Sequence, residues 1–177
     1  MSSCSPALSL LVELNREVES RRLGKVVIVG GSAVELYSGG AYRTGDIDLD
    51  TYKPEEARRV FEELAEKRGW RRVSRTYEGP GALFLDLVRY EYVGRVKVLE
   101  VCGGKVYAQS PEDAMASSIN ACVYWDSPGD CERAVAVLAA QRGYIDWGYL
   151  AALAEKNGVL AKLEELRRAV EGALCGR

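Results

Sequence analysis

The chain contains no histidine, and this absence excludes several kinds of active site. A Ser-His-Asp triad, a Cys-His dyad and every histidine-based zinc site need an imidazole, so none of them can form here. No apolar run approaches the roughly 18–20 residues of a membrane span, and a formal net charge of −2 gives no general field that would attract nucleic acid. The length of 177 residues, with 47% hydrophobic and 28% charged residues, fits one globular domain with a small helical appendage.

The chain also lacks a CxxC pair among its five cysteines. They are Cys4, Cys102, Cys122, Cys131 and Cys175. This odd, scattered set argues against a disulfide framework or a zinc ribbon, so we expect most of these cysteines to be buried or free thiols. Cys122 and Cys131 are the candidate pair for one bridge, if the host keeps intracellular disulfides.

The N-terminal residues lack the pattern of a secretion signal, because Glu13 interrupts the apolar stretch 8–14 and no basic segment precedes it. We therefore expect a cytoplasmic protein without membrane association. The chain has only three Asn and two Gln and prefers Arg to Lys, a composition that favours a thermophilic source.

Hydrophobic periodicity predicts an α+β chain whose first part mixes helices and strands. Pro54 is expected to begin one helix and Ser32 to cap another, short one. Three of the strand-like runs are separated by glycine-containing turns and resemble an antiparallel meander. In chain order, the expected elements are helix 6–23, strand 25–29, helix 33–38, strand 46–50, a helix from Pro54 to the stop at Gly69, strands 70–77, 82–93 and 95–101, and strand 106–108.

From Ser110 onward the pattern predicts only helices. Ser110-Pro111-Glu112-Asp113 is a typical helix start, with a serine cap, proline in the first position and acids in the first turn. The expected helices cover about 113–125, 130–142, 146–156 and 159–174. We therefore expect an α/β core over 1–109, with a small mixed, largely antiparallel sheet and flanking helices, followed by a helical region over 110–177 packed on that core.

Two aspartates in the expected strand 46–50 carry the clearest chemical signal. Asp46 and Asp48 alternate along the strand, so they project from one face with Cα atoms about 6.6–6.8 Å apart. Two carboxylates buried together would repel each other, which makes ordinary core packing unfavourable and calls for a cation between them. Carboxylate oxygens suit Mg²⁺, and a metal pair suits phosphoryl or nucleotidyl transfer. Asp50 lies on the same face, either as a strand-end residue or as a further ligand.

The glycine-rich segment Gly30-Gly31-Ser32 lies where the strand 25–29 is expected to end and a helix to begin. Glycine lets the backbone approach a phosphate closely, while a helix N-terminus presents free N–H groups and Ser32 adds a hydroxyl donor. The alternative for the glycines is an ordinary tight turn. The alternative for the aspartates is a solvated face of an edge strand.

The stretch from Val27 to Tyr37, followed by Tyr42 to Leu49, resembles the nucleotidyltransferase superfamily of the DNA polymerase β type. The matching features are the Gly-Gly/Ser element at residues 30–32 and the apolar-flanked Asp-x-Asp at residues 46–48. The sequence is most similar to the small prokaryotic branch that includes abortive-infection and toxin-type nucleotidyltransferases. The likeness covers about residues 24–140.

The resemblance implies a catalytic centre that binds Mg²⁺ or Mn²⁺ and uses an NTP. Asp46 and Asp48 would hold the metals, and a third acid on a later strand would complete the second metal site and help to deprotonate the acceptor hydroxyl. Glu100 is our choice for that acid because it ends the last strand of the expected meander. Asp86, which is also flanked by apolar residues in a strand, is the alternative.

The resemblance also implies a set of nucleotide contacts. Gly31 and Ser32 would grip the β- and γ-phosphates, Thr44 would orient Asp46, and Arg43 would reach a phosphate. The expected nucleotide-binding residues are Gly30, Gly31, Ser32, Arg43 and Thr44.

The expected function is therefore transfer of an NMP group from an NTP to a hydroxyl of RNA, protein or a small molecule. The expected enzymes include nucleotidyltransferases of the toxin type. Many relatives carry a lysine where this chain has Ser118, so phosphate contacts would come from elsewhere, for instance Arg43, Lys53 or Lys97. The alternative is a catalytically reduced nucleotide-binding or regulatory protein on the same fold. An antitoxin-like partner or a homodimer is expected in either case.

Overall fold

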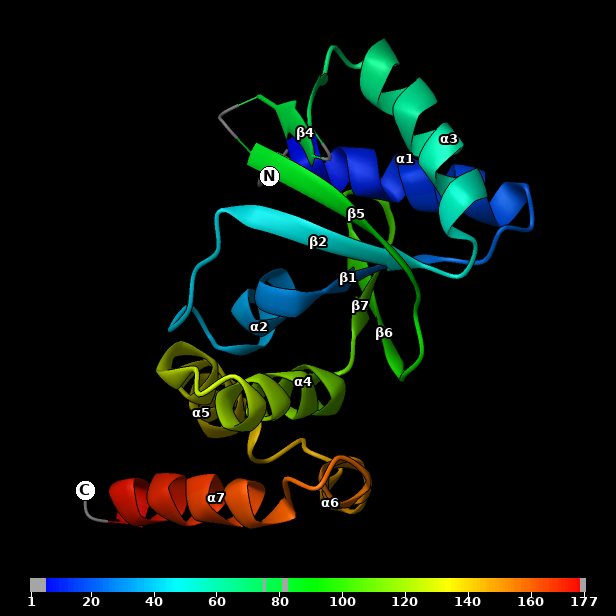
Figure 1. The fold of residues 1–177 in the computed structure, drawn as a ribbon. Coiled ribbons are helices and arrows are strands. Elements are labelled where there is room, and N and C mark those ends of the chain that lie inside the picture. The colour runs from blue at the N-terminus through cyan, green and yellow to red at the C-terminus, as the bar shows by residue number, and fades with distance from the viewer. Residues whose placement is uncertain (1–5, 75, 81–82, 176–177) are drawn as a thin grey trace. The chain divides into compact units, whose positions relative to one another are not determined.

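The computed structural model describes residues 6–74, 76–80 and 83–175, which Figure 1 shows as a ribbon. In chain order the elements are α1 (Pro6–Ser20), β1 (Val26–Val29), α2 (Gly30–Tyr37), β2 (Asp46–Thr51), α3 (Pro54–Lys67), β3 (Arg71–Val73), β4 (Thr76–Gly79), β5 (Leu83–Glu91), β6 (Val96–Val101), β7 (Gly104–Gln109), α4 (Pro111–Tyr124), α5 (Pro128–Gln141), α6 (Trp147–Lys156) and α7 (Leu160–Cys175). No helix in these ranges is both long enough and apolar enough to cross a membrane.

The chain forms two compact units. The first unit contains the residues up to Ser32 together with Thr44–Gln109, and the second contains Ala33–Arg43 together with the residues from Ser110 onward. One division therefore falls between residues 109 and 110. The segment Ala33–Arg43 groups with the helical unit instead of the α/β core, because it packs on α5: the Gln141 side-chain amide donates a hydrogen bond of 3.0 Å to the carbonyl oxygen of Tyr37.

The first unit contains a seven-stranded mixed sheet in the order β3-β4-β5-β2-β1-β7-β6. The β1–β7 and β2–β5 pairs are parallel, whereas the β1–β2, β3–β4, β4–β5 and β6–β7 pairs are antiparallel. The predicted α+β fold with a small, largely antiparallel mixed sheet is confirmed. The prediction of one continuous meander is wrong, because β4 and β2 occupy both edges of β5 and leave β6 to pair with β7 at the far edge.

The two faces of the sheet differ in chemistry. One row of paired residues runs through four neighbouring strands as Ala108, Ile28, Leu49 and Leu87, and all four are buried. This apolar face packs against α1 and α3, and Val12 of α1 fills the space above Gly104. Since side chains alternate along a strand, the neighbouring residues point to the opposite face, and there the aspartates of β2 project.

A buried asparagine connects α1 to β1. Asn15 is 2% exposed. Its side-chain amide donates to the carbonyl oxygen of Leu11 at 3.2 Å, and its side-chain oxygen accepts from the backbone N–H of Val26 at 2.8 Å. The side chain thus satisfies the first backbone donor of the central strand, which fixes where β1 begins relative to α1.

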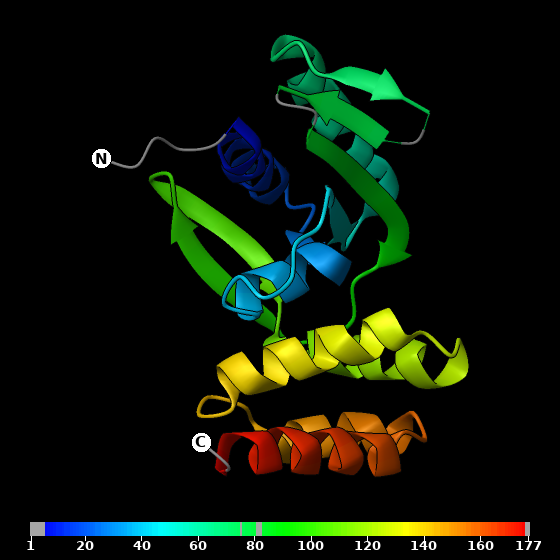
Figure 2. The ribbon, with the colours of Figure 1, turned by 90° about the vertical axis from the view of Figure 1, so that its left-hand side faces the viewer.

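The second unit is built from α4 to α7 and the segment Ala33–Arg43. Ser110 caps α4 as predicted, because its hydroxyl oxygen accepts from the backbone N–H of Asp113 at 3.1 Å. Figure 2 shows α4 and α5 as one layer and α6 and α7 as a second, and α4 contacts α6 while α5 contacts α7.

Disulfides are a finding that the sequence anticipated only in part. Cys122 of α4 and Cys131 of α5 form a disulfide with their Cα atoms 4.9 Å apart, which confirms the candidate pair. Cys102 is disulfide-bonded as well. The expectation of mostly free thiols is therefore wrong for these three residues, while Cys4 lies outside the described residues.

Candidate functional site

Strand pairing brings two of the predicted acids together on one face of the sheet. Asp48 of β2 pairs with Val29 of β1 on one side and with Asp86 of β5 on the other. Asp48 and Asp86 therefore lie directly opposite each other on neighbouring strands, with their Cα atoms about 4.8 Å apart. Both are partly buried. Asp46 precedes Asp48 by two residues, so it projects from the same face and is more exposed.

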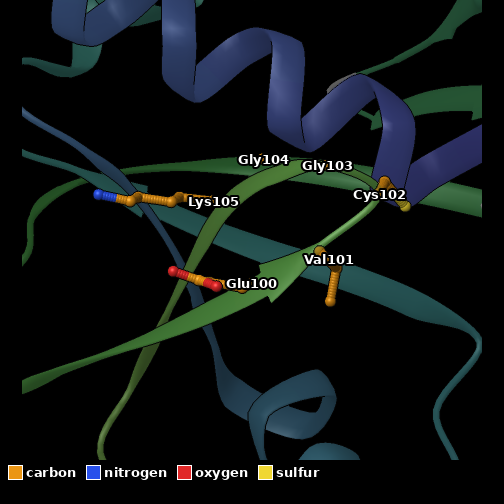
Figure 3. A pocket seen from close by; sticks show the side chains of 6 residues that line it. All are labelled: Glu100, Val101, Cys102, Gly103, Gly104 and Lys105. Carbon is orange, nitrogen blue, oxygen red and sulfur yellow. The ribbon is translucent and has the colours of Figure 1, made fainter.

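The structure does not bring Glu100 to this site. Glu100 lies on β6, three strand spacings or about 14 Å from β2. It pairs with Lys105, near the end of the sheet where β1 begins, whereas Asp48 pairs with the last residue of β1. Figure 3 shows Glu100 and Lys105 on the β6–β7 hairpin, lining a separate pocket of about 480 Å³. Asp86, the alternative from the sequence, is the acid that pairs with Asp48.

Gly30 forms a close contact with Asp48. Its φ angle is +60°, and a Cβ atom placed on it would lie 2.7 Å from a carboxylate oxygen of Asp48. A side chain here would therefore meet both backbone strain and a steric clash. The glycine is needed because the Asp48 carboxylate lies against the backbone at the start of α2.

Ser32 has a different local role from the one expected. The helix α2 already begins at Gly30, with Gly31 as its second residue, so Ser32 lies inside the first turn and does not cap it. Its buried hydroxyl donates to the carbonyl oxygen of Val29 at 2.9 Å. The first turn of α2 thus follows β1 directly, and its backbone N–H groups lie where Asp48 approaches the chain.

Thr44 and Arg43, which were expected to assist the site, lie in different units. The Thr44 hydroxyl donates to a carboxylate oxygen of Asp46 at 2.9 Å, which is the orienting contact that the resemblance implies. Arg43 belongs to the second unit, where its guanidinium forms an ion pair with Glu35 at 2.9 Å. The Arg43 side chain is 81% exposed, so this pair contributes little stability.

Asp50 is the residue whose environment the sequence did not predict. One of its carboxylate oxygens is buried without a hydrogen-bond partner among the described residues. Burial, with a smaller contribution from the negative charge of Asp48, raises the pKa of Asp50 to about 6. The alternation Asp46-x-Asp48-x-Asp50 was the signal for a shared face, but it could not show how deeply the third carboxylate is buried.

The carboxylates on this face of the sheet suit a hard divalent cation, but they do not supply its complete coordination shell. Among the described residues, no group of three or more Asp, Glu, His or Cys side chains is arranged to hold one metal ion. The predicted set of Asp46, Asp48 and Glu100 is therefore not assembled. Mg²⁺ commonly takes one or two carboxylates and completes its shell with water and substrate phosphates, and the neighbouring carboxylates of Asp48 and Asp86 fit this mode.

Comparison with known proteins gives structural but no sequence matches: no family model and no curated protein matches the chain. A crystal structure of an antigenic nucleotidyltransferase-like protein from Paracoccidioides brasiliensis is similar, with a TM-score of 0.59 and 18% identity, covering 92% of this chain and 91% of that one. The antibiotic-resistance factor ANT(2'')-Ia has a TM-score of 0.47 and 19% identity, covering 96% and 97%. JHP933 from Helicobacter pylori has a TM-score of 0.39 and 14% identity, covering 98% and 97%.

Of these three structures, the Paracoccidioides protein is similar enough to show a shared fold. The chain therefore has a nucleotidyltransferase-like fold over nearly its whole length. At this level of identity the similarity extends to the fold, and the chemistry has to be argued from the residues of this chain.

Proposed function

We propose that this chain, which has a nucleotidyltransferase-like fold, transfers an NMP group from an NTP to a hydroxyl group with the help of Mg²⁺ or Mn²⁺. The observation that carries the proposal is the position of Asp48, which lies between the Gly30 backbone and Asp86. The turn that would bind phosphate, the carboxylate that would bind metal and a second acid are therefore neighbours within the first unit.

Each residue has a role that follows from its position. The backbone at Gly30 and Gly31 lets the triphosphate approach, and the first N–H groups of α2 donate to its oxygens. Asp48 and Asp86 would hold the divalent cation, which supplies neutralisation of the charge that develops on the phosphate oxygens. Asp46, held by the Thr44 hydroxyl, would add negative charge on the same face that attracts the cation, without joining Asp48 and Asp86 as a third ligand of one ion.

The reaction is a displacement at the α-phosphorus. The acceptor oxygen forms a new bond to this phosphorus, the bond to the bridging oxygen of the β-phosphate breaks, and pyrophosphate leaves. The proton of the acceptor hydroxyl passes to a carboxylate, for which Asp86 is placed beside Asp48, and then to water.

The acceptor is proposed as a class, namely a hydroxyl of RNA, protein or a small molecule. Toxin-type chemistry with an antitoxin-like partner or a homodimer is the form that the sequence resemblance favours. A cytoplasmic location belongs to the same proposal, and with it a hot-living host, because a cytoplasmic chain would keep the Cys122–Cys131 disulfide mainly in a hyperthermophile.

Replacement of Asp48 by Asn tests the proposal. The amide keeps the shape of the carboxylate but removes its charge, so Asp48→Asn should lower transfer at least about 100-fold with the fold intact. The assay follows label from an α-labelled NTP into pools of RNA, protein and small hydroxyl compounds, together with pyrophosphate release. Asp126→Asn is the matched control, because Asp126 is an exposed residue of the second unit. Full activity of Asp48→Asn would refute the proposed mechanism.

A second candidate is a module that binds nucleotide without turnover. It is favoured by Ser118, which is 6% exposed on α4 and offers no cation where many relatives carry a lysine. Isothermal titration with ATP and Mg²⁺ separates the two functions. Binding without label transfer in the unmodified protein supports the module, and binding with transfer supports the enzyme.

A further inference from the structure

Arg133 of α5 contacts Tyr42, two residues before Thr44 in the chain. The guanidinium group of Arg133 forms an ion pair with Asp130 at 2.8 Å and lies over the ring of Tyr42, 4.8 Å from its centroid. A cation in this position over an aromatic face is attracted by it. Arg133 therefore connects α5 to Tyr42 within the second unit.

The backbone of Tyr42 is held by hydrogen bonding to Ser38. Its backbone N–H donates to the hydroxyl oxygen of Ser38 at 3.1 Å, and the N–H of Ala41 donates to the carbonyl oxygen of Ser38 at 3.2 Å. Ser38 is 4% exposed, and its hydrogen bond with the Tyr42 N–H is partly buried. The chain leaves this anchored point at Tyr42 and reaches Thr44 after one further residue.

The beginning of α5 has a disulfide but, among the described residues, no side-chain cap. Ser127 is the N-cap residue, and its side chain makes no capping hydrogen bond in the described chain. Asp126 before it has a φ angle of +50°, an unfavourable conformation for most residues. Cys131 lies in the first turn beside Asp130 and is bonded to Cys122 of α4. The covalent link thus replaces a cap that would hold this turn in place.

We propose that Arg133 is a positioning residue for the segment Tyr42–Asp46, and that the Cys122–Cys131 disulfide makes this positioning sensitive to the thiol–disulfide state. The disulfide fixes the first turn of α5, this turn holds Arg133 over Tyr42, and Thr44 then presents Asp46. The last step, an effect on transfer, rests on the proposed function; the effect on the segment does not.

The redox step needs a dithiol reductant. One thiolate of the reductant attacks a sulfur of the disulfide, and its second thiolate then displaces the mixed disulfide. The protein disulfide gains two electrons and two protons and becomes two thiols, while the reductant loses them and becomes a cyclic disulfide. The first turn of α5 is then held only by the ion pair and by packing.

Hydrogen exchange of the backbone amides at Ala41 and Tyr42 tests the proposal without any activity. Both amides are hydrogen-bonded to Ser38, so their exchange reports release of the segment. We expect Arg133→Ala to increase their exchange rates about fivefold, as loss of a cation–π contact predicts. The double variant Cys122→Ser with Cys131→Ser should increase them to a similar extent, with the Cys102 disulfide left intact.

Two further variants make the result specific. Arg142→Ala removes an exposed arginine at the other end of α5 and should leave both amides unchanged. Arg133→Lys keeps a cation near Tyr42 and should give an intermediate rate, whereas a general loss of packing would not be rescued by it. Unchanged exchange in both Arg133→Ala and the double serine variant would overturn the proposal.

Label transfer separates this inference from the proposed function. If the unmodified protein transfers label, the double serine variant should raise KM or lower kcat several-fold, and a dithiol should do the same to the unmodified protein. Any further effect of the dithiol on the variant would report the Cys102 disulfide, which the variant retains. If no protein transfers label while the exchange rates change as expected, the positioning role stands and the proposed function fails. Transfer that is unaffected in the variant, with fast exchange, would overturn the regulatory step.

Discussion

At the scale of single residues, Gly30 combines a backbone requirement with a steric one. A Gly30→Ala variant should lose about 1–2 kcal/mol in the free energy of unfolding, because φ is +60°. It should also lose transfer, because the new methyl group would lie 2.7 Å from the Asp48 carboxylate and displace it. Urea denaturation measures the first effect, and the label-transfer assay measures the second.

The matched control is Gly69→Ala in the same unit. Gly69 has a φ angle of +70°, and no described atom lies within 4 Å of a Cβ placed there. The control should therefore show the same backbone cost but normal transfer. Equal transfer in the two variants would contradict a role for the Gly30–Asp48 contact.

Asp50 gives a prediction about pH. Its pKa is raised to about 6, so the folded state binds the proton more tightly than the unfolded state. This group therefore stabilises the fold fully below its ordinary pKa of about 4, and the contribution is lost as the pH rises through about 6. Asp50→Asn should remove the loss and raise the free energy of unfolding at about pH 7 by about 1–2 kcal/mol, after allowance for partial exposure.

Urea denaturation between about pH 4 and pH 8 checks this expectation. The difference between Asp50→Asn and the unmodified protein should shrink toward zero at the acidic end, since Asp50 is neutral there. Asp126→Asn, at an exposed position, should follow the unmodified protein throughout. A constant difference at every pH would show that the ionisation of Asp50 is not its cause.

Most of the candidate site could be predicted from local sequence, but its third acid could not. Asp46 and Asp48 share a face because of strand alternation, and Thr44 reaches Asp46 over two residues. The choice between Glu100 and Asp86 depended on which distant strands pair. The pairing of β2 with β5 joins residues about 40 positions apart and is determined by the arrangement of the whole sheet. The local sequence around Glu100 or Asp86 therefore does not predict it.

At the scale of elements, Asn15 determines how α1 and β1 meet. Asn15→Ala should lower the free energy of unfolding by about 2–3 kcal/mol, because the buried N–H of Val26 loses its acceptor. Asn15→Asp keeps that acceptor but buries a carboxylate against the carbonyl oxygen of Leu11, so at neutral pH it should cost at least as much as Asn15→Ala. Asn157→Ala, at the C-terminal end of α6, is the control. Chemical denaturation that shows equal losses at both asparagines would contradict this role.

Helix starts were easier to predict than strand partners. Pro54 and Ser110 act within one helical turn, and both helices begin where these residues indicate. The expected meander failed because hydrophobic alternation identifies a strand without identifying its neighbour. The predicted start of α2 was residue 33, but the helix begins at Gly30. Glycine can adopt the positive φ that lets the helix begin directly after β1.

At the scale of the whole molecule, the hydrophobic periodicity predicted a mixed part followed by a helical part. It did not predict that the segment Ala33–Arg43 groups with the helical part. The change from mixed elements to helices after Gln109 is visible in periodicity. Ala33–Arg43 groups with the helical unit through contacts of Gln141 and Arg133, which lie about 100 residues further along. These are contacts between residues far apart in the sequence, and no local sequence pattern predicts them.

Both units contain tyrosines that should make the protein sensitive to alkali. Burial, followed by a hydrogen bond to a glutamate, raises the pKa of Tyr77 and of Tyr107 to about 12. Burial and the charges of Glu112 and Asp113 raise the pKa of Tyr37 still further. These hydroxyls stay protonated in the fold when the unfolded chain already ionises, so their stabilisation is complete below about pH 10 and is lost as the pH rises through about 12.

The free energy of unfolding should therefore fall by about 1 kcal/mol for each of these tyrosines between about pH 9 and pH 11. Tyr107→Phe removes one ionisable group, so the alkaline decrease in the free energy of unfolding should become smaller by the contribution of one tyrosine. The variant also loses the hydrogen bond to Glu19. Tyr144→Phe is the control, because Tyr144 is 85% exposed. Urea denaturation gives the free energies, and the ultraviolet absorbance of tyrosinate gives the ionisation of the folded protein. If the buried tyrosines ionised at about pH 10 in the folded protein, the alkaline loss would need another cause, because equal pKa values in both states contribute nothing to its slope.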